Sequence, residues 1–521
     1  MSSPIREAYS KLTASFEKRH NLSHAYYVMM WDNFVNLPPG SGAARKAAIG
    51  EIEGRMHDEL LQPSNLESIK FLFASENQEQ VAQELNEIER ANIREMKRLI
   101  ESKSKLSKEV VERKSKLMSE AELTWRVARK ENDWNKMEPI LQQLFDLARE
   151  MGELLLKGRE GENLTVYDAL IEQFEPGMTC AIIDGVFADL KTWLPDAIKA
   201  RVAAQGEMPP LPTVDKFPIE KQKALNREVM EKLNFDFTRG RADVSVHPFT
   251  GLVPEDVRLT TRYAENEFEM ALMGTIHETG HAMYEQHRPG CVAGNAGGKF
   301  DGLISQPVAS ARGFGVHEGQ SLFHEMQMGR SLPFQKFITP LIKKHLDIDI
   351  SPEILLKRSL AVKSTNKIRV NADEMTYPLH VLIRYEIEKD VLDRKLAVKD
   401  IPDAWNQKMK EYLNVDTTGD FADGPLQDIH WNIMYIGFFP TYTLGSIYAA
   451  QFMAALRRDL GDEKVDADIE KGDFTAIQQW LREKVWNCGS LYETPELLKR
   501  ATGEPFTGKY FKEHILKRYT I

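Results

Sequence analysis

Along much of the N-terminal part of the chain, hydrophobic residues recur every three or four positions with charged residues between them. The runs QELNEIERANIREMKRLIESK and EPILQQLFDLAREMGELLLKG, within residues 78–157, show this spacing. It predicts long amphipathic helices that pack as antiparallel hairpins and expose their charged faces to solvent. Because no internal repeat or low-complexity linker interrupts the chain, we expect one domain over residues 1–521, with a helical N-terminal part over about 1–160.

Alternation of hydrophobic and polar residues is confined to two short segments. ADVSVHPF (242–249) and DVRLTTRY (256–263) alternate, and PFTGLVPED between them carries Pro and Gly turn signals. Helical spacing returns over residues 264–286, where HRPG ends the pattern. The sequence therefore predicts a mostly α fold with a small β-sheet immediately before a helix. An exposed edge of such a sheet could hold an extended peptide by main-chain pairing.

This predicted helix carries two histidines and a glutamate in the pattern His-Glu-x-x-His. His277 and His281 are four residues apart, so they project from the same face, close enough to bind one metal ion. Glu278 lies one position round the helix, where it could act on a water molecule without being a ligand. A chance match occurs in roughly 3% of chains of this composition, so the interpretation needs support from other residues.

A catalytic zinc site needs at least a third protein ligand. The segment GFGVHEGQSLFHEMQMGR (313–330) offers Glu318 and Glu325, which are seven residues apart, and helical spacing alone does not choose between them. Small and polar residues follow Glu318, as expected around a metal ligand. Glu325 lies among Phe and Met residues and is more typical of a helix surface. The local sequence therefore favours Glu318.

The composition argues against several kinds of partner. The formal net charge is −10, and basic residues are interspersed with acidic ones, which disfavours nucleic acid or an anionic membrane as the main partner. Three cysteines, odd in number and far apart, indicate a reduced, cytoplasmic protein, and no secretory signal is visible. Residues 429–456 lack charged side chains but include Pro440 and several polar residues, so we expect a buried wall rather than a membrane span.

Five further short motifs surround His-Glu-x-x-His. In chain order they are His247-Pro248-Phe249, Asp256-Val257-Arg258-Leu259-Thr260, His317-Glu318-Gly319-Gln320, Ile368-Arg369-Val370-Asn371-Ala372-Asp373 and Gly424-Pro425-Leu426-Gln427-Asp428-Ile429-His430-Trp431. Together the six motifs resemble those of the carboxypeptidase Taq family of metallocarboxypeptidases. Softer similarity in LPPGSGAARKAA and YDALIEQFEPGMT extends the resemblance over nearly the whole chain.

The resemblance implies a large helical domain with a deep substrate groove, a small sheet beside the metal, and a homodimer. It also implies an enzyme that releases single amino acids from the C-terminus of peptides. One divalent ion, zinc or alternatively cobalt, would be bound by His277, His281 and Glu318 within the region of about 240–450. The ion would activate a water molecule, and Glu278 would act as the general base.

The resemblance and the local chemistry suggest further site residues. We predict that His430 stabilises the oxyanion, with Tyr435 and Tyr442 as alternatives. Four residues after Glu318 stands Leu322, where many glutamate-ligand zinc peptidases carry an aspartate that orients a ligand. That role must come from elsewhere, and the candidates are Asp373 and Asp428.

An exopeptidase must also recognise the end of its substrate, and a guanidinium binds a carboxylate best. The resemblance favours Arg369 for this role, whereas Arg258 is more typical of a structural ion pair. His247 is a candidate for substrate contact, although a loop histidine satisfied by its own surroundings explains it equally well. Gln427 is a further candidate for substrate binding.

Two other functions remain open at this point. The first is an oligopeptidase that removes dipeptides, since such enzymes share a helical groove with His-Glu-x-x-His and a downstream glutamate. The second is a metal-binding interaction protein without catalysis, which would have no reason to retain Glu278. The preferred C-terminal side chain does not follow from the spacing of any residues.

Overall fold

A computed structural model describes residues 3–212, 214–290, 300–363 and 365–519. The chain is mostly α-helical with one small sheet, as predicted. The N-terminal helices are α1 (Pro4–Val35), α2 (Gly42–Leu61), α3 (Pro63–Leu72), α4 (Gln78–Glu84), α5 (Glu87–Ser104), α6 (Lys108–Glu131), α7 (Trp134–Leu156) and α8 (Val166–Ile171). Long helices over residues 78–157 are therefore confirmed.

Helices α6 and α7 pack against each other as a hairpin. The hairpin turns at Asn132, which adopts the left-handed conformation (φ 53°) that asparagine tolerates, and the side chain of Asp133 caps the start of α7. Leu117 and Ala121 of α6 are buried, while most of its charged residues stay in solvent. Amphipathic spacing thus produced the predicted arrangement.

In the sequence, the sheet comes shortly before the helix that carries the His-Glu-x-x-His motif. Its strands are β1 (Gly240–Val244), β2 (Thr250–Val253) and β3 (Asp256–Thr261), in the order β1-β3-β2. Strand β1 runs parallel to β3, and β2 pairs antiparallel with β3. The two predicted strands are present, and the turn signals of PFTGLVPED mark a real reversal, but they did not reveal strand β2 within the same segment. The reversal takes only Pro254 and Glu255, which leaves residues 250–253 free to pair.

The rest of the chain is helical. The central helices are α9 (Cys180–Ala204), α10 (Ile219–Lys232), α11 (Glu269–Gln286), α12 (Phe314–Leu322), α13 (Leu332–Leu346) and α14 (Pro352–Ser359). A π-helical segment, η5 (Phe323–Gly329), continues α12 directly. The C-terminal helices are α15 (Tyr377–Leu392), α16 (Ile401–Leu413), α17 (Pro440–Leu460), α18 (Asp462–Lys471), α19 (Thr475–Lys484), α20 (Thr494–Thr502) and α21 (Lys509–Tyr519).

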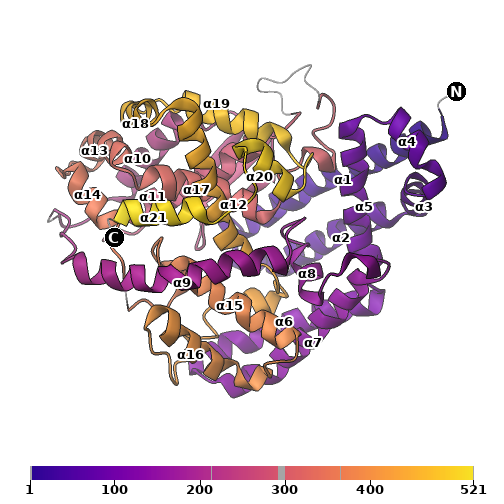
Figure 1. Ribbon diagram of the computed structural model, residues 1–521, viewed down its shortest axis with the longest axis horizontal. Helices are drawn as coiled ribbons and strands as arrows, with labels where there is room; N and C mark the ends of the chain where they lie inside the picture. The colour runs from indigo at the N-terminus through magenta and orange to yellow at the C-terminus, as the bar shows by residue number, and fades with distance from the viewer. Residues whose placement is uncertain (1–2, 213, 291–299, 364, 520–521) are drawn as a thin grey trace.

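Helices α1 to α5 gather at one end of the molecule, at the right of Figure 1, and form a separate small hydrophobic cluster there. The main hydrophobic core extends from α6 to α21. Helix α17 runs through this core and packs most extensively on α12, so the uncharged stretch 429–456 is indeed largely a buried wall. Among the described residues, no helix has the length and apolar character needed to cross a membrane. Of the three cysteines, Cys291 lies outside the described residues.

Candidate active site

A groove of about 2250 Å³ is lined by residues from both the N-terminal and the C-terminal parts of the chain. Its lining residues belong to α1, α6, α11, α12, η5, α17 and the segments 361–363 and 365–374, among others. Both the His-Glu-x-x-His helix and the motif containing Arg369 contribute side chains to it. Segments that are distant in the sequence therefore share one cavity large enough for a peptide.

Three potential ligand side chains converge on the groove from two neighbouring helices. The ligand atoms of His277, His281 and Glu318 all lie within 4.8 Å of one another. The Nε2 atoms of His277 and His281 are 3.8 Å and 3.3 Å from Oε2 of Glu318. His277 and His281 share a face of α11, as their spacing predicts, and Glu318 comes from α12. Two imidazoles and one carboxylate form a donor set suited to a catalytic zinc ion or a similar divalent ion.

Glycines bring these helices close enough for the triad to form. A Cβ atom on Gly280 would lie 2.5 Å from the carbonyl oxygen of Gln320, so α11 and α12 approach through backbone contact. A Cβ atom on Gly445 of α17 would lie 2.8 Å from the side chain of Glu318. Gly280 lies inside the His-Glu-x-x-His motif itself. It therefore serves packing between the two ligand-bearing helices.

The charge balance of the site favours a cation. Burial opposes protonation of His277, but Glu318 and Glu325 raise its pKa to about 10, and burial together with His317 lowers the pKa of His281 to about 4. Although burial opposes ionisation, His277 helps to lower the pKa of Glu318 to about 2. The buried carboxylates thus hold positive charge on His277 when no ion is bound. A divalent cation would supply that charge and displace the proton.

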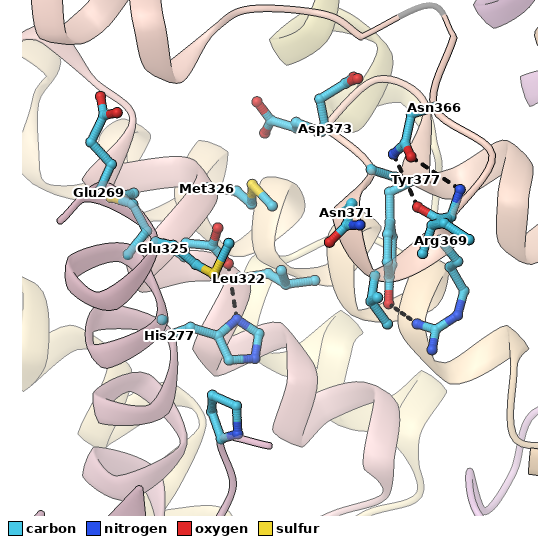
Figure 2. A pocket seen from close by; sticks show the side chains of 18 of the residues that line it. Glu269, His277, Leu322, Glu325, Met326, Asn366, Arg369, Asn371, Asp373 and Tyr377 are labelled. Carbon is cyan, nitrogen blue, oxygen red and sulfur yellow. Dashed lines mark hydrogen bonds and ion pairs between the residues drawn. The ribbon is translucent and has the colours of Figure 1, made fainter. Parts of the chain in front are cut away.

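Glu325 contacts a ligand rather than solvent, so its interpretation as a helix-surface residue was wrong. Its Oε2 lies 2.9 Å from Nδ1 of His277, and its side chain is only 12% exposed. A carboxylate accepts hydrogen bonds, so Nδ1 carries the proton and Nε2 of the neutral ring is free to bind a metal. Arg330 in turn donates to Glu325 at 2.7 Å. Figure 2 shows Glu325 and His277 pointing toward each other.

Glu278 is buried beside the triad, with 6% of its surface exposed. The hydroxyl of Thr250, on β2, donates to Oε2 of Glu278 at 2.6 Å. Burial raises the pKa of the Glu278 carboxyl above its usual range. The sheet therefore contributes directly to the site, because β2, a strand that the sequence did not reveal, supplies the residue that orients Glu278.

Arg369 lies across the groove from His277 (Figure 2) and is almost completely buried. Its Nε and Nη2 donate to Oδ1 of Asp428 at 3.1 and 2.9 Å, and its Nη1 donates to the hydroxyl of Tyr377 at 2.9 Å. Tyr442 presents its ring to the guanidinium, with 4.8 Å between Cζ and the ring centroid. Asp428 therefore holds Arg369, and Asp373, the other candidate for orienting a metal ligand, accepts hydrogen bonds from the backbone of its own loop.

His430 and Tyr442 form a pair in the wall of the same groove, with 3.1 Å between Nε2 of His430 and the Tyr442 hydroxyl. Burial lowers the pKa of His430 to about 3 even though Asp428 opposes this, so the imidazole is neutral at physiological pH. The third candidate for an oxyanion donor, Tyr435, packs against Phe174 and Phe438.

The remaining candidates for substrate binding differ in their surroundings. His247 is exposed in the groove wall. Gln427 also lines the groove, but its amide is used internally: Oε1 accepts from the backbone N–H of Arg369 at 2.8 Å, and Nε2 donates to Lys367 and Asp423 carbonyls. Arg258 pairs with Asp256, at 2.7 Å, and lies over the ring of Trp31. Its guanidinium is thus engaged in a structural ion pair.

A partly buried His-His-Glu triad, with a buried glutamate beside it in a long groove, is the arrangement of a metallopeptidase. The chain matches the carboxypeptidase Taq (M32) metallopeptidase family over residues 11–519. Carboxypeptidase 1 of Bacillus subtilis is 35% identical over 506 residues, which cover 96% of this chain and 95% of that protein. Thermostable carboxypeptidase 1 of Pyrococcus furiosus is 33% identical, with 98% of each chain covered.

Solved structures agree with the sequence relatives. Metallocarboxypeptidase 1 of Trypanosoma cruzi superposes with a TM-score of 0.92 at 40% sequence identity, covering 99% of this chain and 100% of that chain. The chain therefore belongs to the carboxypeptidase Taq (M32) family of metallopeptidases. It is a metallocarboxypeptidase, a peptide hydrolase whose family uses a metal ion.

Proposed function

We propose that this enzyme removes single amino acids from the C-terminus of peptides, with one divalent ion bound by His277, His281 and Glu318. The observation that supports this proposal most strongly is that His277 and Glu318 of the triad line the same groove as Arg369, with His277 and Arg369 facing each other across it (Figure 2). An exopeptidase has to bind the chain end while the last peptide bond lies at the metal. The groove offers a group for each task.

When bound, a divalent ion lowers the pKa of water and polarises the carbonyl of the bond to be cleaved. Glu278 takes the proton from the attacking water and passes it to the leaving amine. Its burial supports this role, because a raised pKa brings the carboxylate closer to the basicity that proton transfer at neutral pH requires. The hydrogen bond from Thr250 fixes the carboxylate's orientation.

We propose that the pair of His430 and Tyr442 stabilises the oxyanion. His430 is neutral, so one of the two groups donates to the other along their 3.1 Å contact. If Nε2 of His430 donates to the phenol oxygen, the Tyr442 hydroxyl is free to donate to the oxyanion. In the other tautomer the proton is on Nδ1 of His430, and the Tyr442 hydroxyl donates to Nε2 instead. Tyr442 is the better donor, because His430 can orient it from behind.

Arg369 is proposed to bind the terminal carboxylate. A guanidinium has five N–H groups, and the contacts with Asp428 and Tyr377 use three of them. One N–H remains on each Nη nitrogen. Two such donors on one planar group match the two oxygens of a carboxylate. His247 is proposed to contact the substrate further along the groove, whereas Arg258 and Gln427 are proposed to support the structure around it.

Other features follow from the family resemblance and the composition rather than from the site. We propose zinc as the ion, with cobalt as the alternative, since a His-His-Glu set suits several divalent metals. We also propose that residues 1–521 form one peptidase domain and that two chains associate as a homodimer. The scattered, odd-numbered cysteines support a reducing, cytoplasmic location.

The test compares peptides that differ only in a free or amidated C-terminus, with products identified by mass. Wild-type enzyme should release one residue per event and discriminate against the amide. Replacing Arg369 by Ala should lower kcat/KM for the acid by roughly 10- to 150-fold, the equivalent of about 1.5–3 kcal/mol for a hydrogen bond to a charged group. It should also abolish the discrimination, whereas Arg258→Ala should preserve the acid-to-amide ratio.

Each other outcome points to a different enzyme. Equal cleavage of acid and amide by the wild type would reject an exopeptidase that recognises the terminal carboxylate. Release of two residues per event would favour the dipeptide-releasing oligopeptidase. A protein that binds zinc tightly and cleaves neither peptide would support the non-catalytic alternative.

A further inference from the structure

Helix α15 carries a stripe of polar residues on a single face, although the helix lies in the core. The stripe consists of Tyr377, His380, Arg384 and Glu388, spaced three or four residues apart. Arg384 and Glu388 are completely buried. An arginine is almost never buried unless it is paired, so the position of Arg384 requires a reason.

Arg384 and Arg369, the residue proposed to bind the substrate's terminal carboxylate, share the same ion-pair partner, Asp428. Its Nε and Nη2 both lie 2.6 Å from Oδ2 of Asp428, whereas Arg369 donates to Oδ1 of the same carboxylate. Nη1 of Arg384 donates to the carbonyl oxygen of His380 at 2.6 Å, and the indole of Trp405 lies beneath the guanidinium. Each oxygen of one carboxylate thus serves a different guanidinium.

Two cations against one anion leave a net positive charge in the buried cluster. Burial and Arg369 lower the pKa of Arg384 to about 10 while Asp428 opposes them, so the guanidinium is still charged at neutral pH. Glu388, one turn further along α15, accepts hydrogen bonds from the Tyr167 hydroxyl, the Trp431 indole and the Gly437 backbone N–H rather than from either arginine, and burial raises its pKa to about 7.

We propose that Arg384 is a positioning residue that keeps Arg369 able to bind the terminal carboxylate of the substrate. Arg384 donates to Oδ2 of Asp428 while Arg369 donates to Oδ1. The negative charge of Asp428 is therefore divided between two guanidinium groups and does not neutralise Arg369 completely. The substrate's carboxylate then completes the charge balance as the second anion of the cluster. This inference rests on the proposed role of Arg369, although Arg384 itself touches no substrate.

The experiment measures the acid-to-amide ratio of kcat/KM for Arg384→Met and Arg384→Lys. The Met variant removes the charge but leaves Asp428 paired with Arg369, so the ratio should fall roughly tenfold, mainly through a higher KM for the acid. Cleavage of the amide should hardly change. The Lys variant keeps the charge and should retain most of the discrimination. Glu388→Gln, a matched change at a buried residue of the same stripe, should leave the ratio near that of the wild type.

A double variant separates charge from simple loss of packing. In Arg384→Met with Asp428→Asn, Arg369 has no competing carboxylate, so the ratio should recover to at least half the wild-type value. A ratio that stays at the wild-type level in Arg384→Met, or falls further in the double variant, would overturn the inference. If the wild type itself does not discriminate between acid and amide, the role of Arg369 fails instead, and the two failures are distinguishable.

Discussion

Replacing Glu325 by Gln should weaken metal binding although Glu325 is not a ligand. The carboxylate accepts a 2.9 Å hydrogen bond from Nδ1 of His277 and thereby keeps Nε2 available for the ion. Glutamine has nearly the same shape and can still accept this bond through its amide oxygen, but it has lost the charge. The substitution therefore changes the electrostatics of the ligand more than its position.

The expected magnitude follows from this contact. A hydrogen bond to a charged group contributes about 1.5–3 kcal/mol, against about 0.5–1.5 kcal/mol for a neutral one. The difference of about 1–1.5 kcal/mol corresponds to roughly a 5- to 15-fold increase in the dissociation constant of the metal. Loss of a nearby negative charge adds to this, and changes behind a metal ligand typically cost 10- to 100-fold. We expect an increase of about 10- to 100-fold.

Glu374→Gln provides the matched control. Glu374 is a buried carboxylate with basic partners, His514 at 2.7 Å and the cationic Arg518 at 3.3 Å, but these belong to α21 rather than to the proposed metal site. Both substitutions leave buried cations without their carboxylate and should lower the Tm. Only Glu325→Gln should affect the metal.

The assay titrates zinc into metal-free wild type, Glu325→Gln and Glu374→Gln in competition with a chromophoric chelator. The reasoning fails if Glu325→Gln binds zinc within about twofold of the wild type, because the expected loss is tenfold or more. It also fails if Glu374→Gln weakens zinc binding equally, since general destabilisation would then explain both results.

Three other predictions concern the proposed base, a proposed metal ligand and the packing between α11 and α12. Glu278→Gln should retain metal content after dialysis but lose about 10²-fold or more in kcat, and a variant with a tenth of wild-type turnover would exclude Glu278 as the base. Glu318→Ala should lose bound metal on dialysis, because two histidines remain of three ligands, and metal analysis checks this directly. Gly280→Ala should force α11 and α12 apart, because the new Cβ atom would lie 2.5 Å from the carbonyl oxygen of Gln320. The free energy of unfolding should fall by about 1–3 kcal/mol, and metal binding should weaken. Urea denaturation checks the first effect and zinc titration the second.

Helical periodicity allowed the sequence to predict several local features. His277 and His281 are four residues apart, and on any helix that spacing places them on one face, so their convergence follows without knowledge of the fold. The amphipathic helices of the N-terminal part and the position of the sheet were predicted for the same reason. A hydrophobic pattern of period 3.6 or 2 is a property of neighbouring residues.

Contacts between distant segments were beyond this reasoning. Glu318 and Glu325 are seven residues apart, and spacing could not show that one would face the ion while the other would lie behind His277. The π-helical segment that contains Glu325 has its own hydrogen-bond spacing, which a regular helical pattern does not reveal. Glu325 looked like an exposed residue in the sequence, but in the folded chain it is mostly covered and contacts His277.

The sequence by itself determined the type of fold and the helix that carries His277, Glu278 and His281, because these depend on residue order over a few turns. Only the tertiary structure decided that Arg369 and Arg384 share Asp428, and that Thr250 orients Glu278 from a strand that the sequence did not reveal. The physical reason is that hydrogen bonds and ion pairs depend on distances of a few ångströms. Those distances arise when the whole core packs, through approaches such as that of Gly280 to Gln320.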